Sequence, residues 1–135
     1  MKYTNKQFVR WDDLDAFGHM NNAKYLTIIQ EARFQWSYAE EKVKREAPTM
    51  MEMVVGRAEV DFISPIYEGG RYYDVTLWVE DIGGASFKLA YEIKGEDGTL
   101  HAKVRTVQVA IDMETKKSRR ISDAERAFLA QYSIE

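Results

Sequence analysis

Apolar residues follow one spacing in the first third of the chain and another spacing in the rest. From Asn21 and Asn22 onward they recur every three or four positions, which is the spacing of one face of an amphipathic helix. Asn side chains at this point can cap the amides of a helix start. The pattern predicts a single long helix of about six turns. Its apolar face consists of Tyr25, Ile28, Ile29, Ala32, Trp36, Ala39 and Val43.

After Pro48 the period changes to two, which is typical of half-buried strands. Glycine-bearing segments between the alternating runs suit tight antiparallel reversals. An aromatic and β-branched run at residues 2–11 predicts one more strand, ahead of the helix. The alternating runs are residues 51–64, 73–79, 85–93 and 100–111.

Two local features are expected near the C-terminal end. The alternation of the last run breaks near Arg105 and Thr106, which predicts a β-bulge. Residues 122–125, with the sequence Ser-Asp-Ala-Glu, are typical of the capped start of a short helix.

The predicted helix and sheet each have one apolar face, and these faces must bury each other. The sequence therefore predicts an α+β fold, in which a curved, mainly antiparallel five-stranded sheet wraps around the long helix. Met53, Val55 and Trp78 lie beside charged residues on the expected outer surface. Such a surface indicates contact with a second copy, so we expect a homodimer or a tetramer built as a dimer of dimers.

The size, the charge and the cysteine and histidine content of the chain exclude several classes of function. A chain of 135 residues, 45% hydrophobic and 30% charged, fits one globular domain over residues 1–135. A net charge of −3 lacks the basic excess of nucleic-acid-binding proteins. The chain has no cysteine, and its two histidines, His19 and His101, lack the spacing of metal ligands. With neither a signal segment nor a long apolar run, we expect a cytoplasmic protein without metal, membrane or nucleic-acid partners.

Candidate chemistry is concentrated between Arg10 and Tyr25, where the first strand leads into the helix. The amides of a helix start, at the positive end of the helix dipole, can stabilise negative charge on a carbonyl oxygen. A carboxylate beside them could attack the carbonyl carbon or activate a water molecule. This region has three carboxylates, those of Asp12, Asp13 and Asp15. Their spacing alone more often indicates acids that shape a loop or cap a helix, because Asp is common in turns.

Several motifs in this region and beyond occur in a distinctive order. The first is Trp11-x-Asp13-x-Asp15-x-x-Gly18-His19-Met20-Asn21-Asn22-x-x-Tyr25-Leu26, followed by Glu31-Ala32-Arg33. Later come Val55-x-Arg57-x-Glu59-Val60-Asp61-Phe62-x-x-Pro65, Val75-x-Leu77 and Gly84-x-Ser86-Phe87. Up to about Ile111 the chain resembles the 4-hydroxybenzoyl-CoA thioesterase branch of the hot-dog-fold acyl-CoA thioesterases. The resemblance implies a hydrolase that splits acyl-coenzyme A into a carboxylic acid and free coenzyme A, with no metal or redox cofactor.

The resemblance also implies roles for individual residues. Asp15 matches the catalytic carboxylate, which acts as nucleophile or as general base. Asn22 matches the position whose backbone N–H polarises the thioester carbonyl, and Gly18 lets the turn approach the substrate closely. His19 could orient Asp15, contact the substrate or hold the loop.

The candidates for substrate binding are Asp13, Met20, Tyr25, Arg57 and Ser86. Asp13 could instead shape the loop, and Met20 and Tyr25 could equally belong to the helix core. Basic residues on the strands could meet the phosphates of coenzyme A or simply be solvated; they are Lys88, Lys103 and Arg105.

Two other functions are compatible with this fold. An acyl dehydratase or hydratase would need a histidine poised with an acid, and the histidine motifs of those families are not seen. The second alternative is a module that binds acyl-coenzyme A or acyl-carrier protein without turnover, and an acyl-carrier-protein thioesterase is a further variant.

Overall fold

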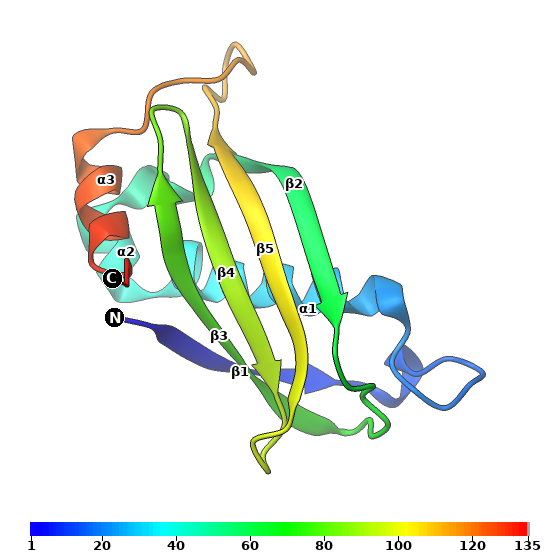
Figure 1. Ribbon diagram of the computed structural model, residues 1–135. Coiled ribbons are helices and arrows are strands. Elements are labelled where there is room, and N and C mark those ends of the chain that lie inside the picture. The colour runs from blue at the N-terminus through cyan, green and yellow to red at the C-terminus, as the bar shows by residue number, and fades with distance from the viewer. Residues whose placement is uncertain (135) are drawn as a thin grey trace.

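The structure, a computed structural model, describes residues 1–134. Five strands form one antiparallel sheet in the order β1-β3-β4-β5-β2 (Figure 1). The strands are β1 (Tyr3–Val9), β2 (Met53–Phe62), β3 (Arg71–Ile82), β4 (Ser86–Lys94) and β5 (Leu100–Ala110). The helices are α1 (Asn22–Phe34), α2 (Glu41–Glu46) and α3 (Asp123–Ala130), with the short turns η1 (Trp11–Asp13), η2 (Gln35–Ala39) and η3 (Pro48–Met51).

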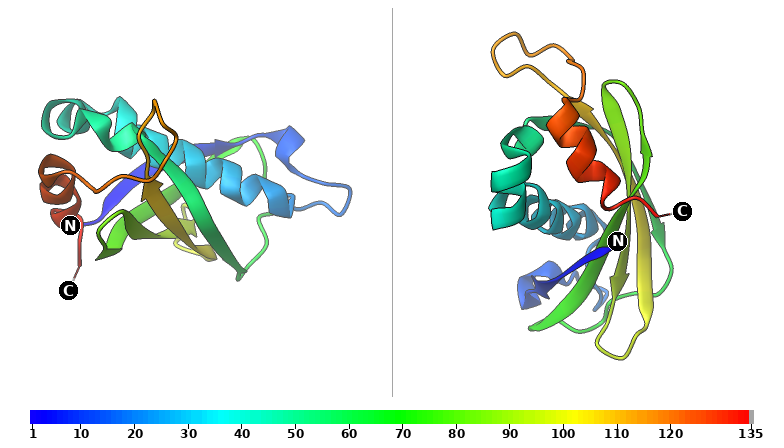
Figure 2. Two further views of the ribbon diagram at one scale, coloured as in Figure 1. Left: turned by 90° about the horizontal axis from the view of Figure 1, so that it is seen from above. Right: turned by 90° about the vertical axis from the view of Figure 1, so that its left-hand side faces the viewer.

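The sheet curves around α1, and all the helices lie on one side of it (Figure 2). Alternate residues of β3, β4 and β5 point inward and meet the apolar side of α1 in one core. Ile29 and Ala32 of α1 are fully buried, as are Val75, Leu89 and Ile93 of the central strands. The predicted α+β fold, a five-stranded antiparallel sheet around a helix, is confirmed.

The sequence predicted one continuous helix, but the structure interrupts it. After α1 the chain makes the π-helical turn η2, and Glu40 then adopts an extended conformation with φ −68° and ψ 141° before α2 begins. Glu40 Oε1 accepts hydrogen bonds from the Tyr3 hydroxyl at 2.8 Å and from Gln35 Nε2 at 3.1 Å. Trp36 and Val43 are buried on either side of the break. The apolar spacing therefore persists through the break, which is why the sequence does not reveal it.

The predicted bulge at Arg105 and Thr106 is wrong, and the register of the sheet shifts at other positions. Burial alternates without interruption along β5, because Thr106 points inward and its Oγ1 is hydrogen-bonded to the Tyr91 hydroxyl at 2.8 Å. The register shifts instead between Val55 and Arg57 of β2, between Val79 and Asp81 of β3, and between Ile93 and Lys94 of β4. In the sequence, a buried polar residue such as Thr106 looks like an interruption of the apolar alternation, although its hydroxyl has a hydrogen-bond partner in the fold.

The predicted C-terminal helix is confirmed as α3, and Ser122 caps it. Ser122 Oγ accepts from the Glu125 N–H at 3.1 Å, while Glu125 Oε1 accepts from the Ser122 N–H at 2.8 Å. Within residues 1–134, no helix has the length and apolar character needed to cross a bilayer.

Candidate active site

The residues between η1 and α1 form a small hairpin that carries the predicted catalytic acid. Leu14 and Met20 pair as an antiparallel bridge. The Asp15 N–H donates to the His19 carbonyl at 2.9 Å, and the Gly18 N–H donates to the Asp15 carbonyl at 3.1 Å. Gly18 has φ 84°, in the left-handed region that favours glycine. The hairpin therefore turns the chain back toward the start of α1 (Figure 1), and the bond to the His19 carbonyl holds Asp15 beside the residues that lead into the helix.

The start of α1 leaves one backbone donor available. The Asn21 N–H donates to the Asp13 carbonyl at 2.9 Å, and the Asn21 side chain caps the helix by accepting from the Ala23 N–H at 2.9 Å. The Lys24 N–H donates to the Asn21 carbonyl at 2.9 Å. Among these amides, that of Asn22 alone has no acceptor in the described chain. This is the donor that the sequence resemblance singles out.

The Asp15 carboxylate is held by one oxygen and leaves the other open. Oδ1 accepts from the Phe17 N–H at 2.9 Å. Oδ2 lies 4.0 Å from His19 Nδ1, beyond hydrogen-bond distance, and the Asp15 side chain is 24% exposed. His19 Nδ1 is instead 3.3 Å from the Met20 carbonyl. Asp15 Oδ2 is thus available to accept a proton or to attack a carbonyl carbon.

Asp13 has a different environment, although it is only two residues away. It is buried, and its carboxylate accepts from the Arg10 N–H at 2.9 Å and from Arg10 Nη2 at 3.0 Å. Burial by itself raises the pKa of Asp13, but the Arg10 hydrogen bonds outweigh that effect and hold the pKa below its ordinary value. Lys24 Nζ adds a cation at 4.0 Å. These contacts fit the alternative in which Asp13 shapes the loop and does not bind the substrate.

Met20 and Tyr25 anchor the hairpin and the helix start in the core. Met20 is fully buried, and its N–H donates to the Ile66 carbonyl at 2.7 Å. The Tyr25 ring packs edge-on against Phe62, with 4.9 Å between the ring centroids. Both side chains therefore pack as core residues in this chain.

The remaining substrate-binding candidates lie elsewhere in this chain. Arg57, on β2, is exposed and forms an ion pair with Glu59 at 2.7 Å. Ser86 begins β4 at the end of the sheet far from the Asp15 hairpin (Figure 1). The structure thus gathers Asp13, Asp15, Gly18, His19, Met20, Asn22 and Tyr25 in the hairpin and the first turn of α1, whereas Arg57 lies on β2 and Ser86 begins β4. A role for these two in substrate binding stays a prediction.

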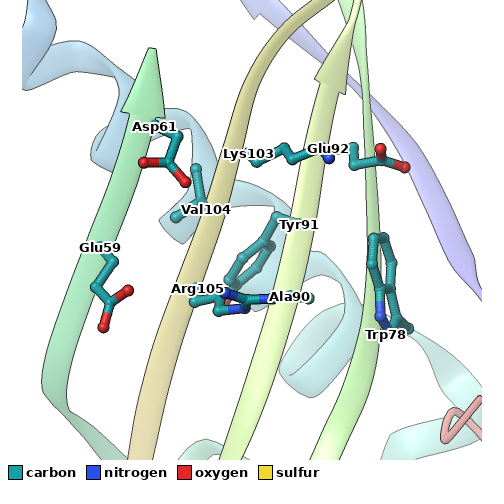
Figure 3. A pocket seen from close by; sticks show the side chains of 9 residues that line it. All are labelled: Glu59, Asp61, Trp78, Ala90, Tyr91, Glu92, Lys103, Val104 and Arg105. Carbon is teal, nitrogen blue, oxygen red and sulfur yellow. The ribbon is translucent and has the colours of Figure 1, made fainter. Parts of the chain in front are cut away.

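The basic residues considered for coenzyme A phosphates are on strands β4 and β5, and acidic groups surround two of them. Lys103 and Arg105 border a shallow pocket on the outer face of the sheet together with Glu59, Asp61 and Glu92 (Figure 3). Arg105 Nε donates to Glu80 at 2.8 Å. This mixture of charges offers little net attraction for a phosphate.

Two aromatic side chains near Asp15 were missed in the sequence. The exposed Phe17 ring stacks on His19, and Tyr67 meets His19 edge-on, each with 6.4 Å between centroids. An aromatic residue in an otherwise polar turn was the available signal for Phe17. Tyr67 gave no such signal, because it reaches the hairpin only through the fold.

Comparisons with known proteins agree with this arrangement. Residues 9–131 match the family model described as the thioesterase-like superfamily. The 1,4-dihydroxy-2-naphthoyl-CoA hydrolase of Nostoc punctiforme is 28% identical over 127 residues, which cover 91% of this chain and 83% of that protein.

Solved structures show the same architecture. A predicted thioesterase from Bacillus stearothermophilus superposes with a TM-score of 0.85 at 26% identity, covering 100% of this chain and 98% of that one. A thioesterase from Thermus thermophilus, solved in complex with coenzyme A and Zn, gives a TM-score of 0.80 at 26% identity. The match covers 96% of this chain and 92% of that one. The match over most of the chain confirms the predicted family: this protein belongs to the thioesterase-like superfamily and is a thioester hydrolase with the hot-dog fold.

Proposed function

We propose that this protein hydrolyses acyl-coenzyme A thioesters at the Asp15 hairpin. The observation that carries the proposal is the pairing of one open carboxylate oxygen, on Asp15, with one open amide, on Asn22, at the start of α1. A thioester carbonyl needs both an electrophilic donor on its oxygen and a nucleophile at its carbon. The names of the relatives support a coenzyme A ester, since one is a naphthoyl-CoA hydrolase and another was solved with coenzyme A.

The chemistry can follow either of two balanced routes. As a general base, Asp15 takes a proton from water, the hydroxide attacks the carbonyl carbon, and the C–S bond breaks to release the thiolate of coenzyme A. As a nucleophile, Asp15 first forms a mixed anhydride and releases that thiolate, and water then hydrolyses the anhydride. In both routes the Asn22 N–H stabilises the developing oxyanion. In the first route protonated Asp15 then gives its proton to the thiolate and is regenerated as a carboxylate. In the second route hydrolysis of the anhydride regenerates Asp15 and forms the carboxylic acid, and the thiolate takes up the proton that this acid releases to solvent.

We also propose that the working form is a homo-oligomer, a homodimer or a dimer of dimers. Exposed apolar side chains line α1 and the edge strand β2, where Val54 and Val55 are 44% and 46% exposed. An uncovered sheet edge with such residues favours pairing with a second copy. We further propose that the protein works in the cytoplasm. It is proposed to use neither a metal nor a redox cofactor, and coenzyme A enters the reaction only as part of the substrate.

The test is hydrolysis of a panel of acyl-coenzyme A esters, followed with a thiol-reactive dye in the presence of a metal chelator. The wild-type protein is expected to release thiol, and Asp15→Asn is expected to lower kcat by about 10²-fold or more, while its circular dichroism stays unchanged. Asp12→Asn is the matched control, because Asp12 is an exposed acid on the same loop. Wild-type turnover by Asp15→Asn would show that Asp15 is only a loop acid.

A further inference from the structure

His19 makes a weaker hydrogen bond than the strongest one its surroundings offer. Its Nδ1 lies 3.3 Å from the Met20 carbonyl oxygen and donates to it, since a carbonyl oxygen can only accept. The same Nδ1 lies 4.0 Å from Asp15 Oδ2, so an approach of about 1 Å would exchange the carbonyl for the carboxylate. Hydrogen bonds to a carboxylate are shorter and stronger than those to a neutral acceptor. The position of the imidazole therefore needs a cause other than hydrogen bonding.

Two aromatic rings hold the imidazole where it is. Phe17 stacks with His19 at an interplanar angle of 21°, and Tyr67 meets His19 at 78°, each with 6.4 Å between ring centroids. Both arrangements are among those in which aromatic rings attract each other. Phe17 belongs to the hairpin itself, whereas Tyr67 comes from the segment between β2 and β3. Contact with this distant segment thus contributes to the position of a side chain beside Asp15.

The segment that carries Tyr67 is anchored on both sides of the ring. Ile66, directly before it, is fully buried, and its carbonyl accepts from the Met20 N–H at 2.7 Å. Directly after it, the Glu68 carbonyl accepts from the Tyr73 hydroxyl at 2.8 Å. Tyr67 itself is 64% exposed, so its ring adds little to the core. An exposed aromatic residue that is held in place beside a reactive carboxylate is suited to a role in function.

We propose that Tyr67 is a positioning residue, which acts through His19 to keep Asp15 Oδ2 free of a hydrogen bond from the imidazole. The inference rests on the proposed function, because the effect is exerted on the catalytic carboxylate. A hydrogen bond from an imidazole stabilises an ionised carboxylate and makes it a poorer base and a poorer nucleophile. Asp15 Oδ1 already accepts from the Phe17 N–H, so Oδ2 is the oxygen that has to stay open.

The first test uses variants of Tyr67 in the acyl-coenzyme A assay. Tyr67→Ala is expected to lower kcat by about fivefold and to leave KM within about twofold of wild type, because the carboxylate is affected and the substrate contacts are not. Tyr67→Phe is expected to retain wild-type kcat, since the contact with His19 is made by the ring. Tyr72→Ala is the matched control, because Tyr72 is a half-exposed tyrosine that packs edge-on against Phe8, at 5.0 Å between centroids. This control is expected to keep wild-type kcat and KM.

Removal of His19 separates this role from a direct contact between Tyr67 and the substrate. In a His19→Ala background no imidazole can approach Asp15, so the further change Tyr67→Ala is expected to leave kcat where His19→Ala has set it. A loss of kcat that persists in this background, or a loss expressed in KM, overturns the proposal.

A spectroscopic measurement needs no turnover and so separates this inference from the proposed hydrolysis. The chain has two histidines, His19 and His101, so NMR spectra of the ring nitrogens contain two residues, which His19→Ala assigns. At one fixed pH, Tyr67→Ala is expected to shift the His19 Nδ1 resonance, and the shift is expected to disappear when Asp15→Ala is added. A shift that does not depend on Asp15, or no shift at all, overturns the inference. The expected shift in a protein that hydrolyses no ester would contradict the proposed function alone.

Discussion

At the scale of single residues, Asp13 and Asp15 show how burial and hydrogen bonding separate two similar acids. Both belong to one short motif, yet Asp13 is buried under Arg10 while Asp15 keeps an oxygen open. The motif identifies the pair, but it cannot tell which carboxylate is already satisfied. That difference depends on the η1 turn, which places the N–H and the guanidinium of Arg10 against the Asp13 carboxylate.

Replacement of these two acids is therefore expected to change stability by different amounts. Asp13→Asn loses charge-assisted hydrogen bonds to Arg10 and is expected to lower the free energy of unfolding by about 2 kcal/mol. Asp15→Asn removes a partly exposed charge and is expected to change it by less than about 0.5 kcal/mol. Urea titrations of both variants provide the measurement. A loss of stability confined to Asp15→Asn would contradict the assignment of the two roles.

Gly18 gives a second prediction at this scale. A Cβ at Gly18 would meet no atom within 4 Å, so Gly18→Ala is strained only by its φ of 84°. The strain amounts to about 1 kcal/mol and acts on the turn that presents Asp15. Gly98→Ala is the matched control, because Gly98 has φ 85° and equally open surroundings in the turn between β4 and β5.

Both glycine variants are expected to lose similar stability in thermal unfolding, but only Gly18→Ala is expected to lower kcat/KM, by about tenfold. Equal activities of the two variants would mean that the Gly18 turn does not position Asp15.

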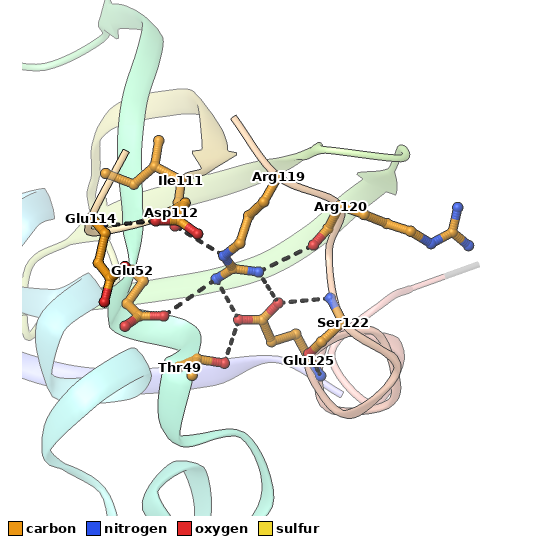
Figure 4. Close-up of polar contacts among 9 residues, drawn as sticks. All are labelled: Thr49, Glu52, Ile111, Asp112, Glu114, Arg119, Arg120, Ser122 and Glu125. Atoms are coloured by element: carbon orange, nitrogen blue, oxygen red, sulfur yellow. Dashed lines mark hydrogen bonds and ion pairs between the residues drawn. The ribbon is translucent and has the colours of Figure 1, made fainter. Parts of the chain in front are cut away.

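At the scale of elements, a buried ion pair attaches the C-terminal helix to the rest of the fold. Glu125 of α3 is fully buried and accepts from Arg119 Nη1 and Nη2, each at 2.8 Å (Figure 4). Thr49, in η3, donates to Glu125 Oε2 at 2.6 Å, and Arg119 also lies 3.8 Å from Glu52. The network therefore joins α3 and the loop before it to the segment that leads into β2.

This network predicts a dependence of stability on acid pH. Burial acts to raise the pKa of Glu125, but hydrogen bonds from Arg119, Thr49 and Ser122 lower it from 4.5 to about 2. Because the pKa is depressed in the folded state, the stabilisation is present above about pH 4.5 and is lost as the pH falls toward 2.

Glu125→Gln is expected to be less stable than wild type by about 3 kcal/mol at pH 7, since it leaves Arg119 without its buried counter-ion. Urea unfolding from pH 7 down to pH 2 should show this difference shrinking toward zero. A difference that stays constant over the whole pH range would rule out Glu125 as the titrating group.

The element boundaries show where sequence patterns are informative. Alternation and caps located the strands and α3, because each depends on neighbouring residues. The break at Glu40 and the shift near Gly56 were not located, because they depend on Tyr3 and on β5, which are distant in sequence.

At the scale of the whole molecule, β2 is an edge strand whose apolar side chains remain uncovered in one chain. Light scattering of the wild-type protein at micromolar concentration is expected to give the mass of a dimer or a tetramer. Val55→Lys places a charge on this edge and is expected to shift the mass toward the monomer. Trp78→Lys, on β3, tests in the same measurement whether the outer face of the sheet also takes part in the assembly. A wild-type monomer would contradict the proposed assembly.

The α+β class, the family and the location of the Asp15 hairpin could all be predicted from the amino-acid sequence. These follow from local spacing and from residue types at fixed separations, which one chain displays directly. Only the folded chain shows which carboxylate is satisfied and which amide of α1 is open. The partners concerned are near in sequence, but which of them meet depends on the turn geometry and the burial that the whole fold imposes on the hairpin.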